Sequence, residues 1–163
     1  MKIIDNALNE EDFLKIKYFM MNECDWYFSE NVVSEQDKVF PYSYFIHNIF
    51  QLHENYQFHL SNSYQLMIPI IKILNPLSIV RIKSNMYINQ NNLIEHGTHI
   101  DSERSIKAAV YYVNSNNGKT IFESGEEIES VENRLVIFDA NHPHRSTNCT
   151  DEWRRITVNF NYV

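Results

Sequence analysis

Six short segments with the composition of β-strands follow Pro76, and they restrict the possible folds more than any other feature of the sequence. Each segment is rich in β-branched and aromatic residues, and clusters of Asn, Gly, Ser and Asp separate one segment from the next. Because a helical stretch precedes them, they predict a mainly β fold, a sandwich or barrel on which N-terminal helices pack. The predicted strands are residues 78–89, 106–113, 120–122, 127–129, 135–139 and 155–162.

The chain before these strands is predicted to supply helices. Asn9 is a good N-cap, an acidic first turn follows it, and residues 10–20 space their apolar side chains at helical intervals. Residues 62–74 repeat that spacing, although Pro69 predicts a kink or a division into two parts. Residues 25–51 are rich in aromatic side chains but show no clear period, so we expect irregular chain that wraps the core.

The length of the chain, 163 residues, is that of one domain with one sizeable core. We therefore expect a single domain over residues 1–163, in which residues 1–76 form a mostly helical support and residues 77–163 form the β core. Hydrophobic residues make up 44% of the sequence and charged residues 21%, which excludes a disordered or collagen-like chain.

Charge and cysteine content exclude several classes of function. The net charge of −7 argues against bulk attraction to nucleic acid or to an anionic membrane. Cys24 and Cys149 are too few for a disulfide scaffold or a Cys-rich zinc site, and they favour a reducing compartment. The first residues turn polar before an apolar stretch forms, and no run of about 18 apolar residues occurs. We expect a cytoplasmic protein.

The predicted strand 78–89 has two contrasting faces, because alternate side chains of a strand point to opposite sides. The apolar face is suited to pack under helices. The polar face must meet either solvent or a polar cavity inside the sheet layers, and we favour the cavity because of the residues described next. The apolar positions are Val80, Ile82, Met86 and Ile88, and the polar positions are Arg81, Lys83, Asn85 and Tyr87.

Two histidines and an aspartate have the order that a metal site requires. His99 and Asp101 lie two residues apart, so both project from the same side of an extended segment. A second histidine, either His142 or His144, follows the predicted strand 135–139. Two histidines and one carboxylate form the facial triad that holds Fe(II) and leaves positions open for a co-substrate and dioxygen. A His-x-Asp pair alone usually indicates a surface polar cluster or a local hydrogen bond, so the interpretation depends on the rest of the chain.

The last predicted strand carries a candidate carboxylate clamp. Arg155, Thr157 and Asn159 share one face of this strand. An arginine at such a position is suited to bind a carboxylate through a bidentate, charge-assisted pair. Arg154 competes for this role, but its position on the other face of the strand favours Arg155.

In this order His99-x-Asp101, His144 and Arg155 with its Thr-x-Asn strand resemble the iron(II)- and 2-oxoglutarate-dependent oxygenases. The resemblance covers the C-terminal half and is nearest to the compact prolyl-4-hydroxylase-like branch of phages and marine bacteria. It implies a double-stranded β-helix, the jelly roll of cupin-like proteins, braced by helices. Residues 77–163 would then form the β-helix core with its metal site.

The resemblance also implies a role for each site residue. His99, Asp101 and His144 would ligate Fe(II) and serve as the catalytic centre, with His144 favoured over His142 by analogy. The co-substrate 2-oxoglutarate would bind to the remaining residues: Arg155 would pair with its distal carboxylate, Tyr112 would hydrogen-bond the same group, Tyr87 would be a pocket aromatic and Thr157 would lie beside Arg155. We further hypothesise that Lys83 or Asn85 lies in the pocket beside 2-oxoglutarate or the substrate.

As the resemblance implies, the protein is expected to be a dioxygenase that uses O2 and 2-oxoglutarate, hydroxylates its substrate, and releases succinate and CO2. The substrate would be a peptidyl residue, for instance prolyl, or a small molecule, and the acidic composition argues against nucleic acid. Two alternatives remain open at this point. One is a catalytically silent jelly-roll binding module, and the other is a zinc-type metal hydrolase with the same ligands.

Overall fold

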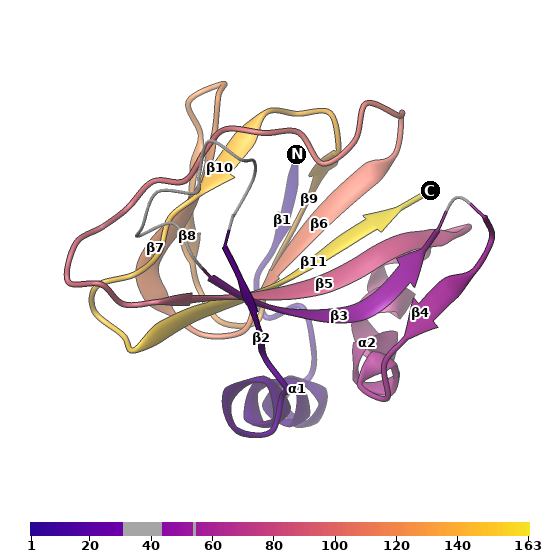
Figure 1. Ribbon diagram of the computed structural model, residues 1–163, viewed down its shortest axis with the longest axis horizontal. Coiled ribbons are helices and arrows are strands. Elements are labelled where there is room, and N and C mark those ends of the chain that lie inside the picture. The colour runs from indigo at the N-terminus through magenta and orange to yellow at the C-terminus, as the bar shows by residue number, and fades with distance from the viewer. Residues whose placement is uncertain (31–43, 54) are drawn as a thin grey trace.

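Two antiparallel sheets face each other in the computed structural model, which describes residues 1–30, 44–53 and 55–163 (Figure 1). An apolar layer between them combines Val110 and Phe138 of the larger sheet with Phe122 of the smaller one. Across the larger sheet, the strands of the described residues are β1 (Lys2–Ile4), β9 (Arg134–Asp139), β6 (Lys107–Tyr112), β11 (Arg154–Tyr162), β5 (Ile79–Ile88), β3 (Tyr44–Leu52) and β2 (Tyr27–Ser29), with β4 (Phe58–Leu60) also paired to β3. The smaller sheet has β10 (His144–Ser146), β7 (Asn116–Phe122) and β8 (Glu127–Ser130).

From β5 onward the chain passes back and forth between the two sheets. After β5, residues 95–99 lie beside β10 through the bridges Glu95–Thr147 and His99–His144, and so belong to the smaller layer. The strands β6, β9 and β11 return to the larger sheet, while β7, β8 and β10 belong to the smaller one. This double winding is the predicted double-stranded β-helix, or jelly roll.

Two helices cover the outer face of the larger sheet (Figure 1). Helix α1 (Glu10–Asn22) begins as predicted, because the Asn9 side chain accepts a hydrogen bond from the backbone N–H of Asp12 at 3.0 Å. Helix α2 (Tyr64–Leu74) runs as one element through Pro69. Neither of these helices, within the described part of the chain, is long and apolar enough to cross a membrane. The core between helices and sheet includes Ile16, Met20, Met67, Ile70, Ile82, Tyr111, Val158 and Phe160.

The prediction of irregular chain over residues 25–51 is wrong for two segments. The strand β3 pairs with β5 over most of its length, and β2 pairs with β3. The register between β3 and β5 shifts between Asn48 and Phe50. A bulge of this kind reverses which side chains face the core, so the strand shows no single period of two in the sequence. Residues 31–43 of this prediction lie outside the described residues.

The expectation of a mostly helical N-terminal support is also wrong. Besides α1 and α2, the described part of residues 1–76 supplies four strands, β1 to β4, to the larger sheet. The predicted strands after Pro76 are all present, with small differences at their ends. The strand expected at residues 120–122 begins earlier, at Asn116, which pairs with Ser130 of β8, and the register then shifts between Asn116 and Lys119.

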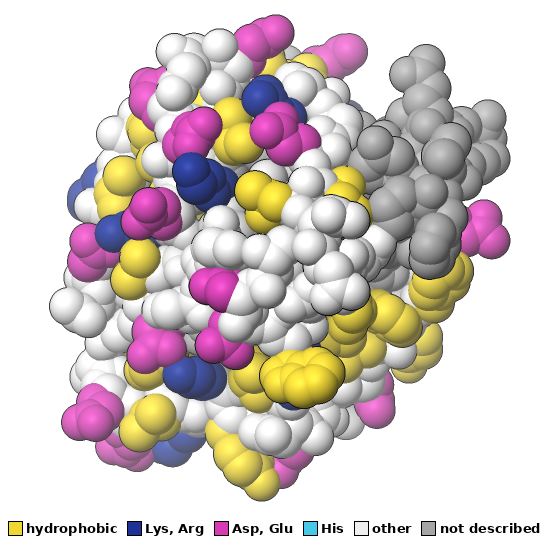
Figure 2. Space-filling model, turned by 90° about the vertical axis from the view of Figure 1, so that its left-hand side faces the viewer, with side chains coloured by type: hydrophobic (Ala, Val, Ile, Leu, Met, Phe, Trp, Pro, Cys, Tyr) yellow, Lys and Arg dark blue, Asp and Glu magenta, His cyan; other side chains and the backbone are white. Residues whose placement is uncertain are grey.

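The outer face formed around the smaller sheet carries charges of both signs. Figure 2 shows this face, on which Lys and Arg side chains lie singly among Asp and Glu side chains. Lys119 pairs with Glu127 at 2.6 Å, and Arg145 pairs with Glu95 at 2.7 Å. The face in view therefore shows no continuous basic stripe of the kind that tracks a nucleic-acid backbone.

Candidate active site

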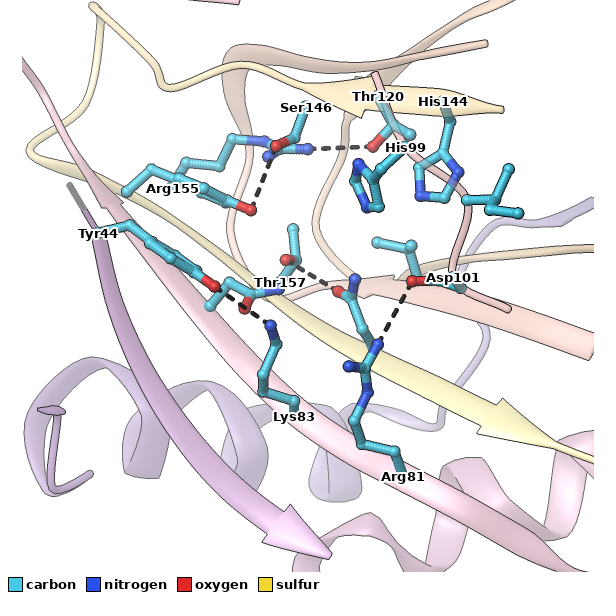
Figure 3. A pocket seen from close by; sticks show the side chains of 15 residues that line it. Tyr44, Arg81, Lys83, His99, Asp101, Thr120, His144, Ser146, Arg155 and Thr157 are labelled. Carbon is cyan, nitrogen blue, oxygen red and sulfur yellow. Dashed lines mark hydrogen bonds and ion pairs between the residues drawn. The ribbon is translucent and has the colours of Figure 1, made fainter. Parts of the chain in front are cut away.

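The polar face of β5 borders a cavity of about 320 Å³ between the two sheets, as the strand pattern predicts (Figure 3). All four predicted polar positions, Arg81, Lys83, Asn85 and Tyr87, line this cavity. The neighbouring wall comes from β11, which pairs with β5 and contributes Arg155, Thr157 and Asn159. The opposite side comes from residues 99–101 and from β10.

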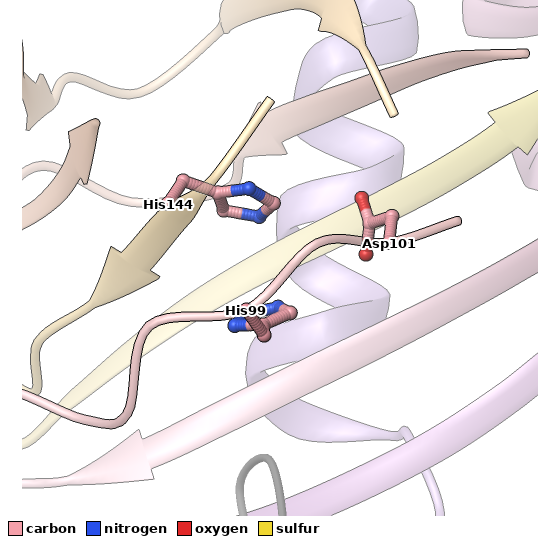
Figure 4. Close-up of side chains that lie close together, drawn as sticks. All are labelled: His99, Asp101 and His144. Carbon is pink, nitrogen blue, oxygen red and sulfur yellow. The ribbon is translucent and has the colours of Figure 1, made fainter. Parts of the chain in front are cut away.

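His99, Asp101 and His144 meet at the side of the cavity that the smaller sheet forms (Figure 4). One potential ligand atom of each residue lies within 4.8 Å of the others. Backbone hydrogen bonds fix this arrangement: His99 and His144 exchange two N–H···O bonds of 2.9 Å, and the Asp101 N–H donates to Ala140 O at 2.8 Å. The two strand ends are thus held in register by backbone pairing, which presents all three side chains to one point.

The ring orientations of both histidines suit metal binding. Nδ1 of His144 lies 2.9 Å from the carbonyl oxygen of His142, and Nδ1 of His99 lies 3.4 Å from that of Gly97. With Nδ1–H donating to a carbonyl, the Nε2 lone pair is left for a metal. Burial, and then the neighbouring His144 ring, lower the pKa of His99, which favours the neutral form that a metal requires.

Arg81 holds the carboxylate of this cluster. Its Nη2 lies 3.4 Å from Oδ1 of Asp101, and its Nε donates to Oδ1 of Asn161 at 3.0 Å. The Asp101 side chain is only 5% exposed, so the arginine compensates part of the cost of burying the charge. Arg81 is therefore a positioning group for Asp101, a role that the sequence did not predict.

Arg155 is a buried cation surrounded by neutral groups. It is 1% exposed, and it donates to Ser130 Oγ at 2.7 Å, to Thr147 O at 3.1 Å and to Thr120 Oγ1 at 3.2 Å. The guanidinium also lies over the rings of Tyr87 and Tyr112, at 5.4 and 5.7 Å from the ring centres. No carboxylate of the described residues lies within 4.0 Å of it. Because a buried charge is costly without a counter-charge, this site favours an anionic ligand.

The structure places the two arginines, and likewise the two histidines, in different surroundings. Arg155 lines the cavity, whereas the Arg154 side chain points away and donates to the backbone oxygen of Met21. His144 belongs to the cluster with His99, whereas Nε2 of His142 lies 2.9 Å from Ser124 Oγ.

The other predicted pocket residues lie in two different places. Tyr87 and Thr157 line the cavity, and Tyr87 is buried with its hydroxyl accepting from Ser146 Oγ at 3.2 Å. Tyr112 lies behind the cavity wall: it is fully buried, and its hydroxyl donates to Thr120 Oγ1 at 2.8 Å. Burial raises the pKa of both tyrosines, so both hydroxyls stay protonated.

Thr120 and Tyr44 are among the cavity residues that the sequence did not predict. Thr120 Oγ1 accepts from both Tyr112 and Arg155, so its own hydrogen is free to point toward a ligand. Tyr44 stacks on Tyr87 with ring centres 5.5 Å apart and closes one side of the cavity. Neither position carries a local signal, because each acquires its role only when separate strands pack together.

Comparison with known proteins places this geometry in a fold family. No protein-family model and no curated protein matches the sequence. Among solved structures, a 2OG-Fe(II) oxygenase family oxidoreductase from Burkholderia pseudomallei matches with a TM-score of 0.68 and 9% identity, over 98% of this chain and 83% of that one. The chain has the fold of the 2-oxoglutarate/iron(II) oxygenases.

Within this oxygenase fold, prolyl hydroxylases are among the similar structures. One from Trichoplax adhaerens, in complex with a hypoxia inducible factor peptide fragment, has a TM-score of 0.65 at 12% identity, over 99% of this chain and 82% of that one. The viral collagen prolyl hydroxylase from Paramecium Bursaria Chlorella virus-1 has a TM-score of 0.62 at 10% identity, over 99% and 94% of the two chains. At these identities the likeness establishes the fold, and function must be argued from the site.

Proposed function

We propose that the protein is an Fe(II)- and 2-oxoglutarate-dependent dioxygenase that hydroxylates a peptidyl or small-molecule substrate. One observation carries this proposal. The cluster of His99, Asp101 and His144 borders the same cavity as Arg155, a buried cation without a counter-charge among the described residues. A zinc hydrolase would use the cluster but has no need of such a cation.

The residues present fit the metal. Two imidazole nitrogens and one carboxylate oxygen are the donor set of the facial triad, and they suit Fe(II) with positions left open. His99, Asp101 and His144 would hold the ion, with the backbone carbonyls of Gly97 and His142 orienting the imidazoles. Bound there, Fe(II) would supply the oxidising chemistry that couples conversion of 2-oxoglutarate and O2 into succinate and CO2 to hydroxylation of the substrate.

Arg155 would hold the distal carboxylate of 2-oxoglutarate. Its Nε and Nη1 donate to Ser130 and Thr147, which fix the plane of the guanidinium. The free hydrogen of Thr120 would add a donor beside it. Tyr87, stacked between the Tyr44 and His96 rings at 5.5 and 4.9 Å, would form an apolar wall that excludes water from the co-substrate.

The peptidyl class of substrate, for instance a prolyl residue, is supported by a structural neighbour, since the Trichoplax prolyl hydroxylase is in complex with a peptide. The volume of the cavity, about 320 Å³, lies at the lower end of the range of small-ligand sites. The co-substrate and one small side chain or one small molecule would fill it.

Anaerobic titration of the Fe(II)-bound protein with 2-oxoglutarate tests this function. We expect the weak visible charge-transfer band of the chelate in the wild type and its loss in His99→Ala. His142→Ala is the matched control, because His142 lies outside the cluster, and it should keep the band. A folded, iron-replete wild type without the band would contradict the proposal.

A further inference from the structure

A second group of cations lines the cavity away from Arg155. Arg155 pairs with Tyr87 across β11 and β5, whereas Lys83 lies four residues before Tyr87 on β5 and Arg81 lies six residues before it. At about 3.3 Å per residue, the backbone positions of Lys83 and Tyr87 are about 13 Å apart. Figure 3 shows Lys83 and Arg81 together on the side of the cavity opposite Arg155.

In the described part of the structure, the ammonium of Lys83 contacts a neutral tyrosine side chain. The ammonium donates to the Tyr44 hydroxyl at 3.2 Å and lies 5.6 Å from the centre of that ring. In the described part of the chain, no carboxylate lies within 4.0 Å of Nζ. Burial, reinforced by the neighbouring Arg81, lowers the pKa of Lys83 to about 8. Among the described residues, this ammonium therefore has no counter-charge.

One neighbour of Lys83 can donate a further hydrogen bond to a ligand. Asn159 pairs with Lys83 across the two strands, and its Oδ1 accepts from the Thr157 hydroxyl at 3.2 Å. The Asn159 amide nitrogen is therefore the part left to meet a ligand. Arg81 adds a second positive charge, although its Nε and Nη2 are engaged by Asn161 and Asp101. Such a group of donors suits a carboxylate, which only accepts hydrogen bonds.

The charges of the cavity lead to the same conclusion. In an acidic protein of net charge −7, the described residues that line the cavity include three basic side chains, Arg81, Lys83 and Arg155, and one acidic side chain, Asp101. The charges of Fe(II), Asp101, 2-oxoglutarate and Arg155 would cancel. The charges of Arg81 and Lys83 would remain, and a carboxylate of the substrate would balance one of these two charges.

We propose that the substrate carries a carboxylate. Lys83 and the side-chain amide of Asn159 bind this carboxylate, and the positive charge of the nearby Arg81 adds to the attraction. This inference rests on the proposed function, because it assigns Arg155 to the co-substrate. The inference favours an acidic substrate over a neutral prolyl residue. This substrate would be an Asp or Glu side chain of a peptide, or a molecule with a free main-chain carboxylate.

Calorimetric titration of the Zn(II)- and 2-oxoglutarate-bound protein with matched pairs of small probes tests the proposal. The first pair is N-acetyl-L-aspartate N-methylamide and the asparagine equivalent, which differ by a side-chain carboxylate. The second pair is N-acetyl-L-alanine and its N-methylamide, which differ by a main-chain carboxylate. We expect the acidic member of at least one pair to bind about tenfold or more tightly than the neutral one. The pair that shows the preference identifies the source of the carboxylate.

Variants at Lys83 complete the test. Lys83→Met should reduce the preference to about twofold or less, Lys83→Arg should keep part of it, and Lys107→Met, which removes an exposed lysine outside the cavity, should leave it unchanged. The affinity for 2-oxoglutarate, measured in the same titrations, should not change in Lys83→Met.

Three results would overturn this inference while leaving the proposed function intact. They are equal binding within both pairs, a preference that survives in Lys83→Met, and a large loss of 2-oxoglutarate affinity in Lys83→Met, which would make Lys83 part of the co-substrate site. Failure of the wild type to bind 2-oxoglutarate at all would instead contradict the proposed function.

Discussion

The cavity has two cationic regions, and they are built differently. Arg155 is fully buried, fixed by three hydrogen bonds and covered by two tyrosine rings. Lys83 is partly exposed and is held by one tyrosine hydroxyl. A rigid cation suits a ligand that is the same in every reaction, and a loosely held cation suits one that enters and leaves. This difference is the basis for assigning Arg155 to the co-substrate and Lys83 to the substrate.

Gly118→Ala should have the largest effect on stability, and it should act where β7 packs against Arg155. A Cβ at Gly118 would overlap Cδ of Arg155 and lie 2.5 Å from the carbonyl oxygen of Asn148. We expect a loss of about 2–3 kcal/mol in the free energy of unfolding, because packing around the arginine leaves no room for a methyl group. Urea unfolding measures this change.

The same substitution should also displace Arg155 and lower the affinity for 2-oxoglutarate. Gly125→Ala is the control, since Gly125 has a positive φ of 103° but no heavy atom within 4 Å of an added Cβ. Gly125→Ala should lower the free energy of unfolding by about 1 kcal/mol through backbone strain and leave co-substrate binding unchanged. Normal stability and normal 2-oxoglutarate affinity in Gly118→Ala would show that Arg155 is not held as tightly as described.

Lys83→Met should have a smaller and opposite effect on stability. The folded-state pKa of Lys83, about 8, is below the usual lysine value of 10.5, so below pH 8 the folded state carries a partly buried ammonium at a cost. Removal of the charge should therefore stabilise the protein by about 1–3 kcal/mol at pH 7. Thermal unfolding of the variant and the wild type measures the gain.

The stability difference between Lys83→Met and the wild type should depend on pH, because the pKa of Lys83 is lowered in the folded state. Between pH 8 and the usual lysine pKa of 10.5, the unfolded wild type binds more protons at Lys83 than the folded wild type does, so wild-type stability rises with pH through this group. The advantage of Lys83→Met should be complete below pH 8 and disappear above pH 10.5. An equally stable or less stable variant at pH 7 would mean that Lys83 already has an adequate partner in the protein.

The sequence predicted the part of the site that depends on local spacing. The alternation of polar and apolar residues along β5 identified the polar wall of the cavity. On β11, Arg155 shares a strand face with Thr157 and Asn159, and this distinguished it from Arg154. The strand β3 was missed because its bulge hides the alternation. Thr120 and Gly118 were missed because their roles arise where β7 packs against the Arg155 side chain, a contact between strands far apart in the sequence.

The account depends most directly on Arg155 as the co-substrate clamp. The decisive measurement is the dissociation constant of 2-oxoglutarate for the Zn(II)-bound protein, determined for the wild type, Arg155→Leu and Arg154→Leu. Because Arg155 alone of the two lines the cavity, Arg155→Leu should weaken binding about 100-fold or more, and Arg154→Leu should bind as the wild type does. Equal affinities in all three proteins, each shown to be folded, would contradict the account.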